Sequence, residues 1–409
     1  MNKINYDKRW IEDYPELGTG PVPTEPCVSP DYYRLEQERV FPKVWLCVGR
    51  VEEIPKPGDY FVQDMVVCKT SIVITRADDG GLVAFHNVCM HRGNKLVWDH
   101  EKRGNAQSLS CRFHGWTFAM DGALVGVPDE KMFYDLKKED CGLARVAVDS
   151  WEGFIFINLM PRPTESLKEF LGGMGEHLAS FPYGAYTQCY SYGAELNANW
   201  KVCLDAFSEA YHVRTIHGQT VGRANFSKEN PMSHPLSVGI FGKHRSCVVY
   251  GNPDHEPGPT AKIAGQYGLT SMNRGASLDM LPPQLNPDRR PEFNFDLNVL
   301  FPNFLIHVRP GEFFTHVFWP LGPDKTYWEG RNYFPPPKTA GQRFSQEYSH
   351  TMRRNAWLED TSTMEATHAG LASGVLKQFM LSDPEILVRH GYSVLETYVG
   401  GLTVEKANG

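Results

Sequence analysis

Short hydrophobic runs separated by turns occupy the chain between residues 45 and 159. Such runs, bounded by polar turn residues, predict β-strands, and here they are Tyr60–Val62, Ser71–Thr75, Leu82–Phe85 and Phe154–Ile157. Asp78–Gly81 and Asp121–Gly122 are typical of hairpin turns. The pattern therefore predicts an all-β domain over residues 44–160, which ends at the proline-containing segment Met160–Pro163.

Helical and strand patterns are mixed in the rest of the chain. Residues 342–372 predict one long helix, whereas residues 218–292 are rich in glycine and proline. Hydrophobic runs that predict an antiparallel sheet are Asn298–Phe301, Phe304–Val308, Phe313–Trp319 and Tyr327–Phe334. These patterns favour an α+β domain over residues 161–409. Residues 1–43, with a helix at Asp31–Val40, are expected to pack on that domain.

Composition and charge exclude some classes of function. The 409 residues suffice for two domains with sizeable cores, and a net charge of −7 without basic runs argues against a nucleic-acid partner. No hydrophobic stretch approaches the roughly 18 residues that span a membrane, and the N-terminal sequence lacks the apolar core of a signal peptide. Seven of the nine cysteines show no paired spacing, which is typical of reduced thiols. We therefore expect a soluble, cytoplasmic enzyme.

The other two cysteines belong to two cysteine–histidine pairs in the predicted all-β domain. Cys89 and His91 form one pair and Cys111 and His114 the other, with nineteen residues between them. Two thiolates and two imidazoles on separate short turns are the ligand set of a Rieske [2Fe–2S] cluster, in which the cysteines hold one iron and the histidines the other. A tetrahedral zinc site is the alternative, although such sites more often use Cys-x-x-Cys followed by spaced histidines.

The residues that flank these pairs resemble the Rieske oxygenases. Arg92 follows the first histidine and Gly115–Trp116 follow the second, as in the oxygenase patterns Cys-x-His-Arg-Gly and Cys-x-x-His-Gly-Trp. Respiratory-chain Rieske proteins have two further cysteines near their ligands, which form a disulfide, and Asn94 and Phe113 occupy those places here. The resemblance therefore favours an oxygenase.

A second group of candidate ligands contains His212 and His217, and the surrounding Asn-Trp-Lys … Glu-x-Tyr-His-x₄-His is similar to the oxygenase α subunits. Two histidines and one carboxylate on one face of a ferrous ion leave open positions for O₂ and substrate. On a regular α-helix the two histidines would point about 140° apart. They can share an iron only if the helix breaks or bulges between them, and Gly218 fits such a helix ending.

The third iron ligand is implied by the resemblance alone. In ring-hydroxylating oxygenases it is an aspartate on a long downstream helix, followed four and five residues later by Met-Glu. Asp360 matches best because Met364–Glu365 follow it at that distance, and Glu359 is the rival. Either carboxylate could instead be an ordinary solvated residue of the helix.

The same resemblance gives a role to Glu209. An acidic residue at this position links an iron-ligand histidine to a cluster-ligand histidine of the neighbouring subunit, and here it would connect His212 with His114. A ligand histidine usually donates its other ring N–H to a carboxylate, which orients the ring. The alternative is a carboxylate on a helix surface. Asp205, four residues earlier, is expected on the same helix face and is a candidate for a supporting catalytic role.

The resemblance implies a terminal oxygenase with a helix-grip (Bet v1-like or START-like) catalytic domain that holds Fe(II) on an antiparallel sheet. Electrons would come from a ferredoxin and/or a flavin reductase. NAD(P)H would act only through that reductase, because the sequence has no Gly-x-Gly-x-x-Gly motif after a strand. The assembly would be a homotrimer, with or without a smaller β subunit.

The expected reaction is mono- or dihydroxylation of a small aromatic or other apolar organic substrate, in the manner of aromatic hydrocarbon catabolism. Such a substrate needs an apolar pocket, and the candidate lining residues are Phe207, Phe301, Phe314 and Trp357, although for each of them packing in the core is the simpler expectation. The alternative function is that of a Rieske electron-transfer protein without a mononuclear iron site.

Overall fold

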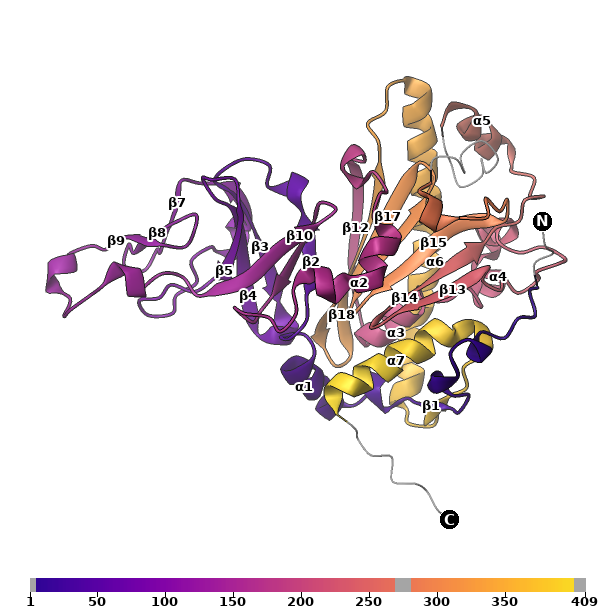
Figure 1. Cartoon of the computed structure of the whole chain (residues 1–409), viewed down its shortest axis with the longest axis horizontal. Coiled ribbons are helices and arrows are strands. Elements are labelled where there is room, and N and C mark those ends of the chain that lie inside the picture. The colour runs from indigo at the N-terminus through magenta and orange to yellow at the C-terminus, as the bar shows by residue number, and fades with distance from the viewer. Residues whose placement is uncertain (1–4, 269–280, 401–409) are drawn as a thin grey trace, which may run out of the picture. The chain divides into compact units, whose positions relative to one another are not determined.

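The computed structural model describes residues 5–268 and 281–400 of the chain. The chain divides into two compact units, one made of residues 37–170 and the other of residues 1–36 and 171–409. Figure 1 shows the strands and helices of both units. None of the helices within the described residues is long and apolar enough to cross a membrane.

A seven-stranded antiparallel sheet forms the framework of the unit made of residues 37–170. In spatial order its strands are β2 (Leu46–Arg50), β11 (Phe154–Asn158), β10 (Arg145–Trp151), β5 (Leu82–His86), β4 (Thr70–Arg76), β3 (Asp59–Met65) and β6 (Arg103–Asn105). A three-stranded sheet consists of β7 (Ser108–Ser110), β8 (Thr117–Ala119) and β9 (Leu124–Gly126). The predicted strands correspond to β3, β4, β5 and β11, so the all-β structure of this unit is confirmed.

A buried hydrophobic cluster joins the two sheets of this unit. It includes Val73 of β4, Phe85 of β5 and Phe118 of β8, together with Cys89 and Cys111. Burying a large apolar side chain contributes about 1.5–3 kcal/mol relative to leaving it exposed. Cys89 follows β5 and Cys111 follows β7, so the two cysteine–histidine turns rest on this packed base.

The other unit contains a second seven-stranded antiparallel sheet. Its strands in spatial order are β12 (Gln188–Leu196), β18 (Lys325–Phe334), β17 (Glu312–Gly322), β16 (Phe304–Arg309), β15 (Phe293–Leu300), β14 (His244–Tyr250) and β13 (Ser237–Phe241). A short pair joins β1 (Val22–Pro23) to β19 (Gln378–Phe379). The α-helices within the described residues are α1 (Pro30–Arg39), α2 (Leu167–Leu178), α3 (Trp200–Asp205), α4 (Val213–Ile216), α5 (Pro259–Tyr267), α6 (Ala340–Ala372) and α7 (Ile386–Val399).

The antiparallel sheet and the long helix confirm the predicted α+β class. The helix expected over residues 342–372 is α6, which begins at Ala340 because the Thr339 side chain accepts a hydrogen bond from the Gln342 N–H and caps its first turn. The sequence patterns missed β12, β13, β14, α2, α5 and α7. The hairpin of β13 and β14 lies in the segment that was described only as rich in glycine and proline.

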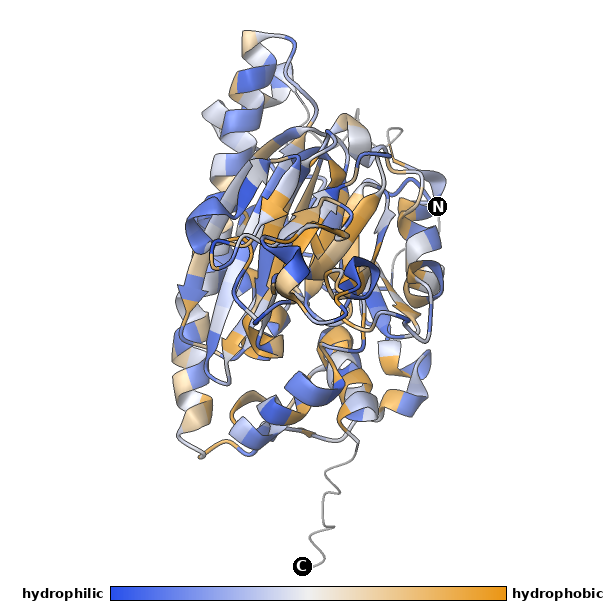
Figure 2. Ribbon diagram, turned by 90° about the vertical axis from the view of Figure 1, so that its left-hand side faces the viewer, coloured by the Kyte–Doolittle hydropathy of each residue, from blue (hydrophilic) through white to orange (hydrophobic). Residues whose placement is uncertain are grey.

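Aromatic side chains fix α6 against the sheet. The ring of Trp357 lies edge-on to Trp328 of β18 and to His316 of β17, with ring centroids 5.8 and 4.8 Å apart. Hydrophobic residues gather on the strands in Figure 2, whereas hydrophilic residues are frequent on the outer helices and loops. Because α6 is held on the sheet, the side chains along its inner face have fixed positions.

A buried ion pair ties the N-terminal segment to the start of α3. The Lys201 ammonium lies 2.6 Å from Glu36 Oε1, and Trp200 Nε1–H donates to Glu36 Oε2 at 3.1 Å. Glu36 is 0% and Lys201 1% exposed. The Asn199 side chain caps α3 by accepting the Lys201 N–H. The Asn-Trp-Lys motif thus sets the start of the segment that leads to the histidines.

Candidate metal centres

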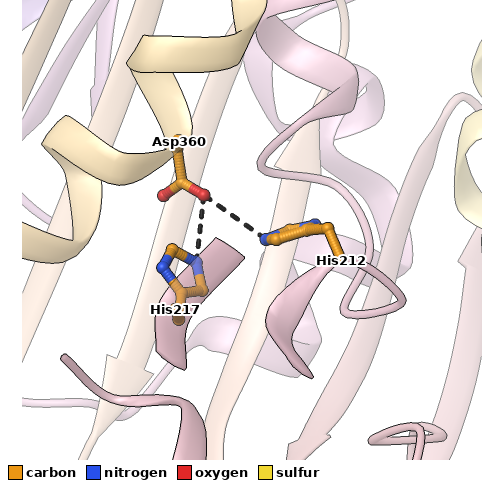
Figure 3. Close-up of side chains that lie close together, drawn as sticks. All are labelled: His212, His217 and Asp360. Carbon is orange, nitrogen blue, oxygen red and sulfur yellow. Dashed lines mark ion pairs between the residues drawn. The ribbon is translucent and has the colours of Figure 1, made fainter. Parts of the chain in front are cut away.

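His212, His217 and Asp360 come together in the second unit, as Figure 3 shows. The two histidines flank α4, a single helical turn, and Asp360 lies on α6. Asp360 Oδ1 lies 3.3 Å from His212 Nε2 and 3.0 Å from His217 Nε2. One ligand atom from each side chain lies within 4.8 Å of the other two, close enough for all three to bind one metal ion.

The helix around the two histidines ends at His217, but not through Gly218 in the way the sequence suggested. At His217 the α-helix gives way to a 3₁₀-helix, His217–Gln219. The separation of about 140° holds only for two residues on one regular α-helix, so it does not apply to His212 and His217. The φ angle of Gly218 is not in the left-handed region. The histidine rings lie edge to face with centroids 5.2 Å apart.

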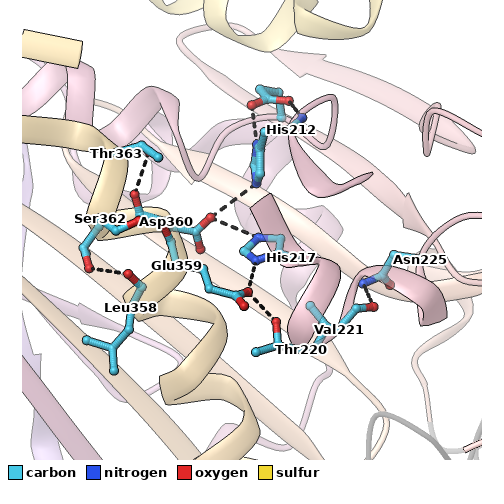
Figure 4. A network of polar contacts seen from close by, with 12 residues as sticks. His212, His217, Thr220, Val221, Asn225, Leu358, Glu359, Asp360, Ser362 and Thr363 are labelled. Carbon is cyan, nitrogen blue, oxygen red and sulfur yellow. Dashed lines mark hydrogen bonds and ion pairs between the residues drawn. The ribbon is translucent and has the colours of Figure 1, made fainter. Parts of the chain in front are cut away.

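Each histidine is oriented by a glutamate on the side away from Asp360, and Figure 4 shows Glu359 in this position beside His217. His212 Nδ1 lies 2.5 Å from Glu209 Oε1, and His217 Nδ1 lies 2.8 Å from Glu359 Oε2. A carboxylate accepts hydrogen bonds, so each ring donates its Nδ1–H to its glutamate and turns Nε2 toward Asp360. This is the arrangement that a metal bound at Nε2 requires.

The surroundings of Asp360 fit a cation. Its buried Oδ1 has no hydrogen bond of acceptable geometry, although both Nε2 atoms are close. Burial lowers the pKa of His212, but the carboxylates of Asp360 and Glu209 raise it to about 10. Two imidazole nitrogens that face one carboxylate oxygen need positive charge between them, which is supplied either by a proton on Nε2 or by a metal ion that replaces it. Two imidazoles and one carboxylate are the ligands of the ferrous facial triad.

Glu359 does not lie where an iron ligand would, and Asp205 does not lie on a helix face with Glu209. Glu359 lies on the far side of the His217 ring, where it also accepts the Thr220 hydroxyl at 2.5 Å, so it supports His217 rather than facing Asp360. Asp205 accepts the Tyr392 hydroxyl at 2.8 Å. Burial raises the pKa of Asp205 to about 7, with Tyr392 acting in the opposite direction.

The expectation that Asp205 and Glu209 share a helix face is wrong. α3 ends at Asp205, and Glu209 lies in the turn that follows. The Ser208 hydroxyl donates to the Leu204 carbonyl at 2.8 Å and takes the place of a helical N–H. Glu209 contacts His212 from this turn.

The two cysteine–histidine turns of the first unit have the same backbone geometry. In each, the N–H four residues after the cysteine donates to the cysteine carbonyl at 2.9 Å, from Gly93 to Cys89 and from Gly115 to Cys111. The two glycines have φ angles of 76° and 73°, in the left-handed region that favours glycine. The glycine after each ligand histidine is therefore part of the turn.

The four candidate cluster ligands point toward one another without forming a single-ion site. Cys89 and Cys111 are buried, and the rings of His91 and His114 lie 4.7 Å apart. The buried His91 Nδ1 has no hydrogen-bond partner, as a metal-binding nitrogen requires. Within residues 5–268 and 281–400, only the His212 set meets the distances for one ion. That these four side chains are not such a set is consistent with ligands divided between two irons.

A cavity opens beside Asp360 and the two histidines. It contains about 760 Å³ of empty space, its open mouth included. Phe207, Phe314 and Trp357 line it, as the sequence suggested, together with His316. Phe301 is not part of this lining, because its ring stacks on Tyr398 with centroids 5.0 Å apart. The cavity gives a substrate direct access to the three candidate iron ligands.

Sequence reasoning missed two arginines of this cavity, Arg309 on β16 and Arg353 on α6. Arg353, Trp357 and Asp360 follow one another at the spacing i, i+4, i+7, which places them on one helix face. That spacing could have revealed Arg353. Arg309 reaches the cavity through the pairing of β15, β16 and β17, which no local pattern indicates.

Comparison with known proteins decides the family. Residues 183–401 match the family model described as the ring-hydroxylating alpha subunit (catalytic domain), and residues 44–146 match the Rieske [2Fe-2S] domain. The chain belongs to the Rieske ring-hydroxylating oxygenase family. The two domains of these oxygenases carry a Rieske [2Fe–2S] cluster and a mononuclear iron, so the predicted cofactors are confirmed.

Curated relatives among the Rieske oxygenases differ in their substrates. The large oxygenase component of the naphthalene 1,2-dioxygenase system of Pseudomonas aeruginosa is 35% identical over 48% of this chain and 45% of that protein. The glycine betaine monooxygenase oxygenase subunit of Chromohalobacter salexigens is 32% identical over 73% of this chain and 67% of that protein. The chain thus aligns with less than half of the naphthalene relative.

Solved structures of Rieske oxygenases share the fold. A quaternary ammonium Rieske monooxygenase, CntA, has a TM-score of 0.74 at 21% identity and covers 97% of this chain and 99% of its own. Naphthalene 1,2-dioxygenase from Rhodococcus sp. has a TM-score of 0.72 at 20% identity and covers 95% and 96%. The relatives agree on the architecture and leave the substrate open.

Proposed function

We propose that this chain is a terminal oxygenase component, which uses O₂ and electrons from a separate reductase or ferredoxin to hydroxylate an organic substrate. The observation that carries the proposal is the convergence of His212 Nε2, His217 Nε2 and Asp360 Oδ1 beside a cavity. When bound, the cluster supplies electrons one at a time and the mononuclear ferrous ion supplies O₂ activation.

The protein's own side chains hold and orient these centres. His212, His217 and Asp360 would bind the mononuclear iron, while Glu209 and Glu359 keep the proton of each ring on Nδ1. Cys89, Cys111, His91 and His114 would bind the cluster. In the described part of the chain three carboxylates surround the two histidines, so the site stabilises a divalent charge in a buried place.

Electron delivery requires partners and an assembly. We infer a ring-shaped homotrimer, with or without a small β subunit, in which His114 of one subunit approaches Glu209 of the next. Support comes from the iron end of this route only, where Glu209 Oε1 accepts the His212 Nδ1–H and Glu209 Oε2 accepts the backbone N–H of His212 at 3.3 Å. A solved structure of a quaternary ammonium Rieske monooxygenase is described as giving insight into inter-subunit electron transfer, for that protein.

The substrate that the cavity supports best has an aromatic ring. Phe207, Phe314 and Trp357 contribute apolar lining next to the iron ligands, and aromatic side chains pack well against flat apolar ligands. The reaction would be mono- or dihydroxylation of that ring. The naphthalene dioxygenase relative is consistent with such a substrate.

Iron analysis tests this proposal against an electron-transfer protein. The oxygenase should contain about three iron atoms per chain, two in the cluster and one in the mononuclear site, whereas an electron carrier should contain about two. Oxygen uptake and product mass are then measured with a surrogate reductase and a panel of aromatic compounds. Two irons per chain and no oxygen uptake with any compound would reject the oxygenase.

A further inference from the structure

Two guanidinium groups line one part of the cavity and share a single carboxylate. Arg353 Nη2 lies 2.5 Å and Arg309 Nε 3.4 Å from the same atom, Glu312 Oε1. Glu312 stands behind the arginines and does not line the cavity. The side chains of Arg309, Arg353 and Glu312 are only 4%, 11% and 1% exposed. The three side chains therefore carry one net positive charge, which lies in a poorly solvated wall.

Helix α6 sets the distance between this positive charge and the iron site. Arg353 and Asp360 are seven residues apart on one helix, which corresponds to two turns and a rise of about 10.5 Å. Trp357 lies between them on the same face and lines the same cavity. Burial and Arg353 lower the pKa of His316, whereas Asp360 raises it. His316 therefore interacts electrostatically with both Arg353 and Asp360.

Two residues that line the cavity have a buried hydrogen-bond donor without an acceptor. Trp328 Nε1–H donates to His316 Nδ1 at 3.1 Å, so the neutral His316 ring carries its proton on Nε2. Neither His316 Nε2 nor Arg353 Nε has a hydrogen-bond partner, and both atoms are buried. A buried donor without an acceptor is costly. A bound ligand with acceptor oxygens could supply the acceptors that these donors lack.

We propose that the substrate carries a carboxylate, which binds Arg353 and Arg309 while its other end reaches the iron ligands beside Asp360. The inference rests on the proposed oxygenase function and names its substrate class. Arginine pairs with a carboxylate through two parallel hydrogen bonds, and pairing in a poorly solvated wall strengthens the attraction. The Arg353 guanidinium is itself stacked over Phe314, with its Cζ 4.0 Å from the ring centroid, and Trp357 lines the cavity between Arg353 and Asp360, where the ring of an aromatic acid would lie. A purely cationic substrate would be repelled by the same two arginines.

Binding to the iron-loaded enzyme tests the carboxylate requirement directly. Benzoate and 2-naphthoate are compared by calorimetry with benzamide and 2-naphthamide, which have the same shape without the charge. We expect at least one acid to bind tenfold or more tightly than its amide. Glycine betaine is a further test ligand, because it carries an aliphatic carboxylate together with a quaternary ammonium group. If no carboxylate in the panel binds more tightly than its uncharged counterpart, the inference is overturned.

Three variants assign the effect to the cavity. Arg353→Gln should weaken binding of the preferred acid about tenfold or more and leave the amide within about twofold, whereas Arg353→Lys should retain part of the preference. Arg354→Gln is the matched control, because Arg354 is the next residue of α6, bonds Asn355 Oδ1 at 2.8 Å and does not line the cavity. Equal losses in the Arg353→Gln and Arg354→Gln proteins would contradict the assignment.

Oxygen uptake with a surrogate reductase separates this inference from the function on which it rests. Acid-selective binding that depends on Arg353, without product from any bound acid, supports the anion site and counts against the oxygenase. Oxidation of neutral arenes with no preference for acids supports the oxygenase and overturns the anion site. If Arg353→Gln does not fold, the acid–amide comparison on the unaltered enzyme still decides.

Discussion

The ion pair between Glu36 and Lys201 offers a test of how the N-terminal segment supports the iron site. The side chains are 0% and 2% exposed, and the ammonium lies 2.6 Å from the carboxylate. Glu36→Gln keeps the shape and an oxygen for Trp200 but leaves the ammonium buried without a counter-charge. Removing one partner of a buried pair typically costs about 3–5 kcal/mol.

That cost translates into a measurable shift. For a unit of this size, each kcal/mol lowers the Tm by roughly 2 °C, so we expect a decrease of about 6–10 °C. Adding Lys201→Met removes the second charge and should restore stability to within about 1–2 kcal/mol of the original protein, because a well-packed apolar replacement is often neutral. Far-ultraviolet circular dichroism follows unfolding, and the visible absorbance of the cluster reports separately on the unit that holds it.

An exposed ion pair serves as the control. Glu195 and Lys325 lie 2.5 Å apart with side chains 57% and 43% exposed, and Glu195→Gln should cost less than about 1 kcal/mol. If Glu36→Gln costs no more than this control, or if the double variant is as unstable as Glu36→Gln alone, then burial of the pair does not determine its energetic role.

Three further predictions concern the iron site. Asp360→Ala should empty the mononuclear site and leave the cluster spectrum unchanged, whereas Glu359→Gln should retain iron with an affinity about 10–100-fold lower. Iron content and chelator competition measure both effects. The reverse pattern would make Glu359 the ligand. The carboxylates raise the pKa of His212 to about 10 against the effect of burial. Fe²⁺ must therefore displace a proton at pH 7 and bind more tightly as the pH rises toward that value. Calorimetry in buffers of different ionisation enthalpy should show proton release, and the absence of proton release would refute this prediction. Glu209→Gln should keep cluster and iron but turn over at least about tenfold more slowly, and full activity would exclude the inter-subunit route.

The sequence predicted those parts of the sites that lie within one turn of chain. Cys89 and His91 are separated by one residue, and His212 and His217 by one helical turn, so residue type and spacing suffice. Asp360 lies 143 residues beyond His217, and only the family resemblance pointed to it. The structure brings Asp360 to the histidines, and it places Glu359 behind His217, because α6 packs on the sheet through Trp357.

Elements with buried polar residues escaped prediction. β14 begins with His244 and Arg245, which are each 1% exposed, so the strand shows no alternation of polar and apolar residues. α7 contains Gly391, which weakens a helical pattern. The structure supplies the reason, since a Cβ at Gly391 would lie 2.7 Å from Arg245 Nη2. Each residue is intelligible only through its contact with the other, which sequence reasoning cannot see.

One rigid helix carries both Asp360 and Arg353, and this has a consequence for how the enzyme could change its substrate. The separation between the carboxylate and the guanidinium cannot vary continuously. An arginine placed at the next position on the same face of α6, instead of at position 353, would lie one helical turn away, about 5.4 Å along the helix. An insertion between the two would rotate Asp360 by about 100° away from His212 and His217. Substrate length in this lineage should therefore change in steps, by substitution at positions such as 353 and 357, and not by insertion into α6.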